Sequence, residues 1–246
     1  MRRLMLPVLL AGLLLLLPEA ARAQAFSIDL GHNDAGTTSR LVQLTALITL
    51  LSLAPSLLVM VTAFTRIIIV LSLLRSALSA QGTPPNTVLI GLALFLTFFV
   101  MEPALSQAWA NGIVPMMQGQ IAELDGLRAA ASPFHHFMIA NIRPDDLALF
   151  QHIAKLPDAP PSADTSWRAL VPAFMIGELR RGFEMGFLLY LPFLAIDIVV
   201  SSILMSLGMM MLPPSAVSLP FKLIFFVLID GWHLVAGSLV QSFAPG

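Results

Sequence analysis

Long apolar runs, separated by short polar or proline-rich stretches, dominate the chain. Apolar segments at about 41–74 and 88–109 form one pair, and two runs within 171–246 form a second pair. A helix of roughly 20 apolar residues is enough to cross a bilayer. Pro55 lies inside the first segment, where it removes a backbone hydrogen bond and favours a kink. The pattern predicts an all-α membrane protein built from kinked helical hairpins.

The second hairpin carries charges where hydrocarbon is expected. Asp197 lies in its first apolar run, and Lys222 and Asp230 lie in its second. Such charges are costly in a membrane and need partners. With the turn centred near Leu212, Lys222 lies roughly 7.5 Å nearer the turn than Asp197, a distance that a lysine stem largely covers. We predict an Asp197–Lys222 pair, inside the hairpin or across a subunit boundary, with Asp230 left to another partner; snorkelling of Lys222 to the interface is the alternative.

The turn of this hairpin contains three consecutive methionines. Its sequence, GMMMLPP, places Met209, Met210 and Met211 just before two prolines that a helix cannot easily continue through. Methionine is flexible and polarizable, and it most often fills gaps in a core. On a non-helical loop between two membrane segments, the same residues could instead form a deformable plug.

Two charges in the first hairpin each have two interpretations. Arg66 divides the first apolar segment, so either the helix stops near it or one very long helix buries it. Glu102 precedes Pro103 in the second segment, where it either marks a helix end at the headgroups or is buried with a partner.

A third group of charges leads into the second hairpin. Glu178, Arg180, Arg181 and Glu184 fall within two turns of a predicted helix, at spacings of three and four residues. Side chains at these spacings are neighbours on a helix surface. We therefore expect the cluster to neutralise itself on one helix.

Composition supports a membrane protein and excludes several other classes. Only 11% of the residues are charged, against roughly 25% in a typical soluble domain. The net charge of −1 does not favour nucleic acid as a partner, and the absence of cysteine excludes disulfides and thiolate sites. No phosphate loop, HExxH or GxSxG motif is present, so we expect no enzyme and no cofactor. His135, His136 and His152 lack the spacing of metal ligands, so we expect no metal site.

The first 23 residues have the pattern of a cleaved signal peptide. Arg2 and Arg3 precede a short apolar core, and the small-x-small site at 21–23 places cleavage between Ala23 and Gln24. A polar tail at 24–40 follows. With four apolar segments, both mature ends and a small helical insertion at 110–170 would then lie outside the cytoplasm.

Residues 171–243 closely resemble the FliP family of flagellar biosynthetic proteins, through the stretches PAF…EL, SLGMMMLPP and LPFKL…FVLIDGW. The resemblance extends to the first hairpin, whereas 120–165 match only loosely. The family belongs to the type III secretion export gate and has a counterpart in virulence injectisomes (FliP/SctR-like). The cleavable signal and the chain length are more similar to the flagellar branch.

The resemblance implies an assembly and a role. Members form a homo-oligomeric ring that joins FliQ, FliR and other export components in the inner membrane, at the flagellar basal body. This export-gate ring is the pore through which unfolded flagellar protein substrates leave the cytoplasm. In the family the methionine loop is thought to form a gasket around the closed pore, which here corresponds to Met209, Met210 and Met211.

A transporter or channel for small solutes or ions is the competing interpretation. In that case Asp197, Lys222 and Asp230 would line the path of the solute. A transporter would work as an isolated protein, whereas an export-gate subunit would require its partners.

Overall fold

The computed structural model describes residues 59–79, 82–209 and 211–243, with isolated helical positions at 45, 48, 49, 52 and 56. Residues 53–246 form one compact unit, separate from 1–52, and every element below belongs to it. All regular elements in the described ranges are helices, which confirms the all-α prediction. In chain order they are α3 (Phe64–Ala77), α4 (Asn86–Ala108), the π-helix η1 (Trp109–Ile113), α5 (Val114–Met117), α6 (Glu123–Asn141), α7 (Pro144–Ile153), α8 (Trp167–Ser206), α9 (Pro214–Leu228) and α10 (Gly231–Gln241).

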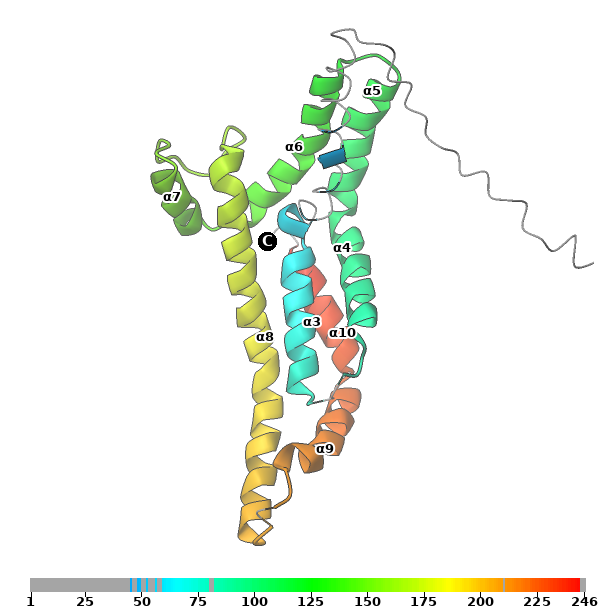
Figure 1. Cartoon of the computed structure of the whole chain (residues 1–246), viewed down its shortest axis with the longest axis vertical. Helices are drawn as coiled ribbons and strands as arrows, with labels where there is room; N and C mark the ends of the chain where they lie inside the picture. Colours follow the sequence, from blue (N-terminus) through cyan, green and yellow to red (C-terminus); the bar gives the residue numbers. More distant parts are fainter. Residues whose placement is uncertain are drawn as a thin grey trace, which may run out of the picture. The chain divides into compact units, whose positions relative to one another are not determined.

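Helix α8 connects most of this unit. It is 40 residues long and continues through Pro172 and Pro192 without ending. Along its length it packs against α7, α6, α3 and α9, as Figure 1 shows. The charge cluster at 178–184 and the first arm of the second hairpin are therefore parts of one helix.

The core forms around α3. Its buried residues Ile67, Val70, Leu71, Leu74 and Ala77 follow the helical spacing of one apolar face. Leu89 and Met101 of α4, Phe193 of α8 and Leu239 of α10 complete this cluster. A second cluster joins α6, α7 and α8 through Met138, Leu147 and Phe174. Each large apolar side chain buried in this way contributes about 1.5–3 kcal/mol.

Two glycines permit close contacts between helices. A Cβ atom at Gly186 of α8 would lie 2.3 Å from Leu73 Cδ1 of α3. At Gly112 of η1 a Cβ atom would lie 2.5 Å from the backbone nitrogen of Ala130 in α6. A side chain can move to relieve such a contact, but the backbone of a helix cannot, so the η1–α6 contact requires glycine more strictly.

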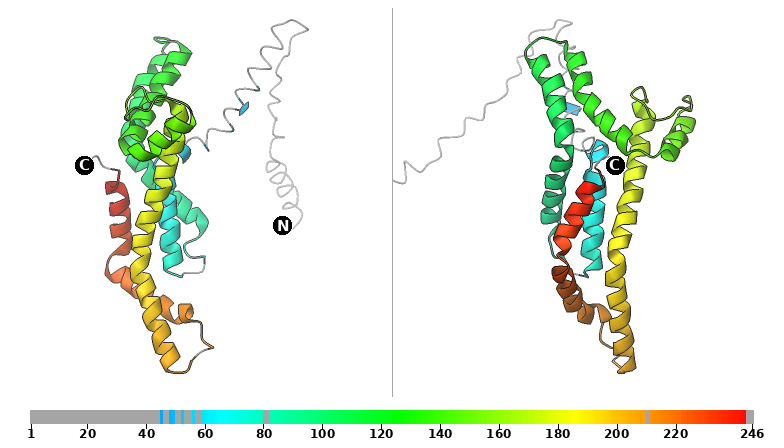
Figure 2. Two further views of the ribbon diagram at one scale, coloured as in Figure 1. Left: turned by 90° about the vertical axis from the view of Figure 1, so that its left-hand side faces the viewer. Right: turned by 180° about the vertical axis from the view of Figure 1, so that it is seen from behind.

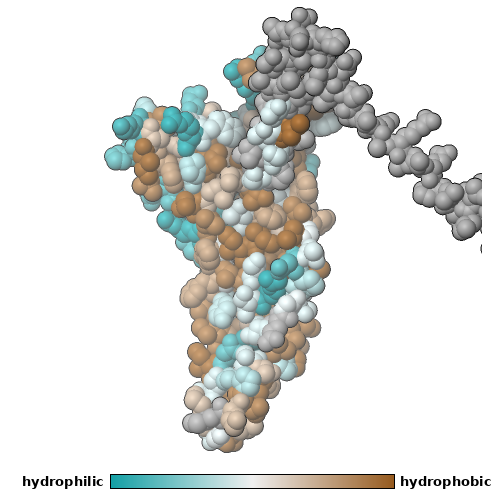
Figure 3. All heavy atoms as spheres, viewed as in Figure 1, coloured by the Kyte–Doolittle hydropathy of each residue, from teal (hydrophilic) through white to brown (hydrophobic). Residues whose placement is uncertain are grey.

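Two helical stretches among the described residues are long and apolar enough to cross a membrane, at Asn86–Met117 and Trp167–Ser206. Helices α9 and α10 form a third candidate as a pair bent by 64°. In Figure 3 apolar residues cover much of the surface along α8, while hydrophilic residues gather around α7. The front part of the first predicted apolar segment (41–74), up to residue 58, falls largely outside the described residues, and so do the signal peptide and the tail.

Three boundaries differ from the prediction. The helical path after α4 does not close at Trp109 but continues through η1 and α5 to Met117. The segment at 41–74 is interrupted at Thr62 and Ala63, after which α3 begins. The second arm of the hairpin breaks at Asp230, whose φ of 51° is left-handed. Figure 2 shows how the chain turns there from α9 into α10, which then lies beside α4.

Replacing Gly112 with alanine tests the η1–α6 contact. The Cβ atom would overlap the α6 backbone, so Gly112→Ala should lower the unfolding free energy by about 1–3 kcal/mol. Gly91→Ala is the matched control, because a Cβ atom there meets nothing within 4 Å and alanine favours a helix. Unfolding of the detergent-purified protein measures both, and equal stability of the two variants would contradict the prediction.

Candidate functional site: buried charges and the methionine turn

Lys222 of α9 is fully buried and uses all three of its N–H donors. Its Nζ donates to Asp197 Oδ2 of α8 at 2.7 Å, to the Ala77 carbonyl at the end of α3 at 2.8 Å, and to Ser79 Oγ at 2.8 Å. Ser79 has a left-handed φ of 54°, and this contact helps to hold it there. Lys222 therefore joins three helices and does not snorkel toward an interface.

Asp197 makes a second contact with α9. Ser218 Oγ donates to Asp197 Oδ1 at 2.6 Å, so the carboxylate binds two residues one turn apart on the same face of α9. The hairpin register placed Lys222 in reach of Asp197 but did not identify Ser218. The spacing of four residues between Ser218 and Lys222 was the signal that could have found it.

Arg66 forms the second buried charge site. Both side chains of its ion pair with Glu178 of α8 are at most 1% exposed. Arg66 Nε donates to Glu178 Oε2 at 2.9 Å, and Nη2 donates to Oε1. Its Nη1 donates to the Ser242 carbonyl at 3.0 Å and to Ser242 Oγ at 2.9 Å. The Phe243 ring lies 3.7 Å from the guanidinium carbon, a cation–π contact that completes the site.

The sequence predicted that the charge cluster on α8 neutralises itself, but only the Glu178–Arg181 pair forms within it among the described residues. Glu178 pairs mainly with Arg66, and Arg181 Nη1 lies 3.9 Å from its Oε1. Arg180 reaches Asp146 of α7 at 3.4 Å. Glu184 is exposed and has no ion pair among the described residues. The main partners come from helices distant in sequence, because a buried charge that is left without a partner is strongly destabilising.

The methionine turn begins with a helix-ending motif. Gly208 has a left-handed φ of 73°, its N–H donates to the Met205 carbonyl, and the Met209 N–H donates to the Leu204 carbonyl. This is the Schellman pattern that ends many helices. Met209 is 42% exposed and Met211 is 98% exposed, while Met210 lies outside the described residues. The two described methionines are therefore exposed and do not fill the core of this chain.

The remaining predicted positions are more exposed. Glu102 lies on the surface of α4, and Asp230 is exposed at the break before α10 without capping it through its side chain. Ala23 and Gln24 fall outside the described residues.

The histidines form no metal site in the described part of the chain. His135 is buried, and its Nε2 lies 2.7 Å from the Thr165 carbonyl oxygen. Within the described ranges no group of three His, Cys, Asp or Glu residues could hold a metal ion.

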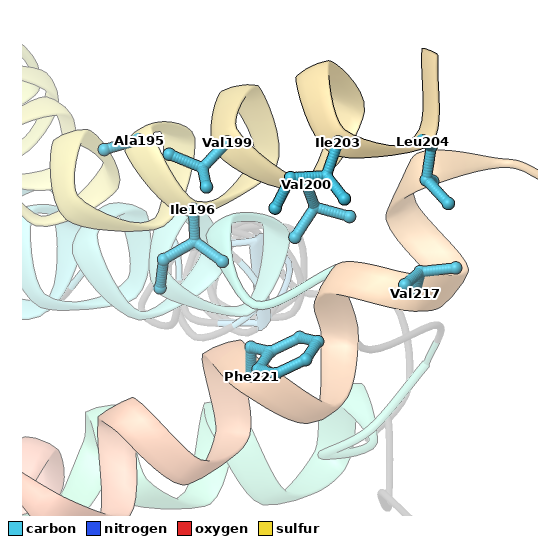
Figure 4. A pocket seen from close by; sticks show the side chains of 8 residues that line it. All are labelled: Ala195, Ile196, Val199, Val200, Ile203, Leu204, Val217 and Phe221. Atoms are coloured by element: carbon cyan, nitrogen blue, oxygen red, sulfur yellow. The ribbon is translucent and has the colours of Figure 1, made fainter. Parts of the chain in front are cut away.

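Beside the Lys222 site, a groove of about 500 Å³ lies between α8 and α9. Figure 4 shows its lining, which is made entirely of alanine, valine, isoleucine, leucine and phenylalanine side chains. None of these side chains carries a ligand for an ion or a hydrogen-bonding group for a polar solute. Asp197 and Lys222 therefore face contacts between helices and not this groove.

The helices and their buried ion pairs define a polytopic helical membrane protein. The chain belongs to the FliP family, whose family model matches residues 47–239. It is 53% identical to the flagellar biosynthetic protein FliP of Caulobacter vibrioides over 246 residues, which is all of this chain and 92% of the relative. It is 48% identical to that of Agrobacterium fabrum (94% of this chain, 96% of the relative) and 48% identical to that of Bacillus subtilis (86% and 96%).

Membership of this family gives the general role. The protein is a structural component of the flagellar export apparatus, and its family is not an enzyme family.

A double-mutant cycle tests the role of the Lys222 site. Asp197→Ala leaves a buried ammonium without its counter-charge, and Lys222→Ala removes three hydrogen bonds, so each should cost about 3–5 kcal/mol of stability and impair motility. The double variant should be little worse than either single variant, because both break the same contact. Ser202→Ala is the control on α8, since Ser202 donates only to its own helix. Additive losses in detergent unfolding would show that the two residues act separately.

Proposed function

We propose that the protein is a core subunit of the flagellar type III export gate, forming the inner-membrane pore through which unfolded flagellar substrates pass. In this proposal the methionine turn at 209–211 seals the closed pore. Family membership supports the export role. The geometry of the second hairpin supports the assignment of the seal.

One observation carries the assignment of the seal. Met211 is 98% exposed at the tip of a hairpin whose arms are joined at Asp197 through Lys222 and Ser218. A stem fixed in this way presents its tip at a defined position. The side chains there are flexible and apolar, so they can close around substrates of varied shape or against one another.

The exposed apolar surface supports an assembly in a membrane. Helix α4 exposes Phe95, Phe98 and Phe99, and α8 exposes Phe187, Leu188 and Ile198. A surface of this kind is stable only against lipid or other apolar helices. We propose that further copies of this chain in a ring, FliQ, FliR and membrane lipid cover it. In the flagellar basal body, residues 110–170 and both mature ends then lie on the periplasmic side.

A small-solute or ion transporter fits the structure less well. Transport along Asp197 and Lys222 requires groups that can release their partners and bind a solute. All three donors of Lys222 are instead bonded within the chain, and the adjacent groove has no polar lining.

Co-purification tests the proposed assembly. In mild detergent the protein should elute as an oligomer together with FliQ and FliR when the three are expressed together. Size-exclusion chromatography with mass measurement gives the composition. A monomer that carries a solute across vesicles by itself would contradict the export-gate role and favour the transporter.

Replacement of the methionines tests the proposed seal. Met209→Ala, Met210→Ala and Met211→Ala together should make cells that express the complex permeable to a small membrane-impermeant dye, because alanine is too short to close the gap. Met117→Ala is the control, as Met117 is an exposed methionine outside the hairpin. Unchanged dye uptake in the triple variant, with the complex assembled, would show that the turn is not the seal.

A further inference from the structure

A second, larger groove lies among α4, α6, α8 and the segment after α10. Its volume is about 850 Å³, and it is lined largely by apolar side chains, including Phe98 and Phe99 of α4, Phe137 of α6, and Phe243. Ligand sites in proteins commonly have this size, with mostly apolar walls and a few polar groups that fix orientation. This groove contains such polar groups, and the contacts of the buried ion pairs do not account for all of them.

Arg181 is the cation of this groove. Its side chain is 30% exposed and lines the groove. Its only hydrogen bond among the described residues runs from Nη1 to the Asn141 carbonyl at 2.8 Å, although a guanidinium has five N–H donors. The guanidinium therefore keeps donors for a ligand.

The charge behind Arg181 is not balanced. Arg66 and Arg181 both lie against Glu178, so these three side chains carry a net charge of +1, and Glu102, which lines the same groove, forms no ion pair with Arg181 among the described residues. An uncompensated charge among apolar membrane helices is costly, and an anionic group on Arg181 would remove that cost. Arginine binds phosphate oxygens through two parallel N–H donors, which makes a phosphate well suited to this position.

The helices around the groove indicate the source of the phosphate. Helices α4 and α8 are both candidate membrane spans, whereas α6 belongs to the segment 110–170 that we place on the periplasmic side, so the groove would lie where the membrane meets that side. A guanidinium pairs with a phosphate group through parallel N–H donors, and the phosphate of a lipid headgroup is such a group. Glu102 also lines the groove, and its carboxylate matches an ammonium group. We propose that this groove binds a phospholipid with its phosphate on Arg181, an acyl chain against the phenylalanines, and phosphoethanolamine as the preferred headgroup.

Lipid retention by the isolated protein tests the proposal, whatever the protein's role in export. The purified protein is incubated in mixed micelles with equal amounts of phosphatidylethanolamine and phosphatidylglycerol. It is then washed in detergent, and the bound phospholipid is quantified by mass spectrometry. Wild type should retain about one phospholipid per chain, mainly phosphatidylethanolamine, and excess inorganic phosphate should not displace it because phosphate lacks the acyl chain.

Two variants and one control make the test specific. Arg181→Gln should lower retention roughly tenfold or more, as expected for the loss of charged hydrogen bonds. Ala140→Phe leaves Arg181 unchanged and fills the groove that Ala140 lines, so it should lower retention similarly. Arg180→Gln is the matched control, because the neighbouring Arg180 pairs with Asp146 and does not line the groove. Size-exclusion chromatography confirms that each variant is folded.

Several results would overturn the proposal. These are no bound phospholipid in wild type, retention by Arg181→Gln and Ala140→Phe that equals that of wild type, or a preference for phosphatidylglycerol. Release of the lipid when another membrane polypeptide binds would show that the groove is a protein interface, and would also overturn it.

Discussion

A charge among apolar helices is stable only beside its partner, and this constraint positions α8. Glu178 pairs with Arg66 of α3, and Asp197 pairs with Lys222 of α9. The two sites are 19 residues apart, which is roughly 28 Å along a helix. Removing one member of such a pair costs more than the pair contributes, since the remaining charge is left buried. The long helix is therefore fixed at two points, Glu178 in its N-terminal half and Asp197 nearer the methionine turn.

The apolar contacts depend on this arrangement. Gly186 lets α3 approach α8 closely enough that Leu73 packs against the glycine backbone. Such packing stabilises the unit but has little directional preference, because apolar contacts are roughly proportional to area. The ion pairs add direction. They specify which turn of α3 and which turn of α9 lie against α8, and the C-terminal Ser242 and Phe243 complete the Arg66 site.

Left-handed residues define where the second hairpin changes direction. Gly208 ends α8, and Asp230 separates α9 from α10. Helix α9 is thus a short element between two turns, held to α8 by Ser218 and Lys222. This explains how an exposed methionine tip can be fixed to a stem that is otherwise apolar. It also explains why the second arm is not the single straight helix that its hydropathy suggests.

The sequence by itself determined the helical class, the methionine turn between two apolar runs, and the need for partners at Asp197 and Lys222. These features depend on local pattern, or on a register across one short turn, and a pair 25 residues apart can be placed from helix geometry. Tertiary structure decided the rest. Arg66 and Glu178 are 112 residues apart, and Arg66 and Ser242 are 176 apart, so no periodicity links them. Hydropathy marked Arg66 as unusual, and spacing paired Glu178 within its own helix, so only the packing of α3 against α8 could select their partners.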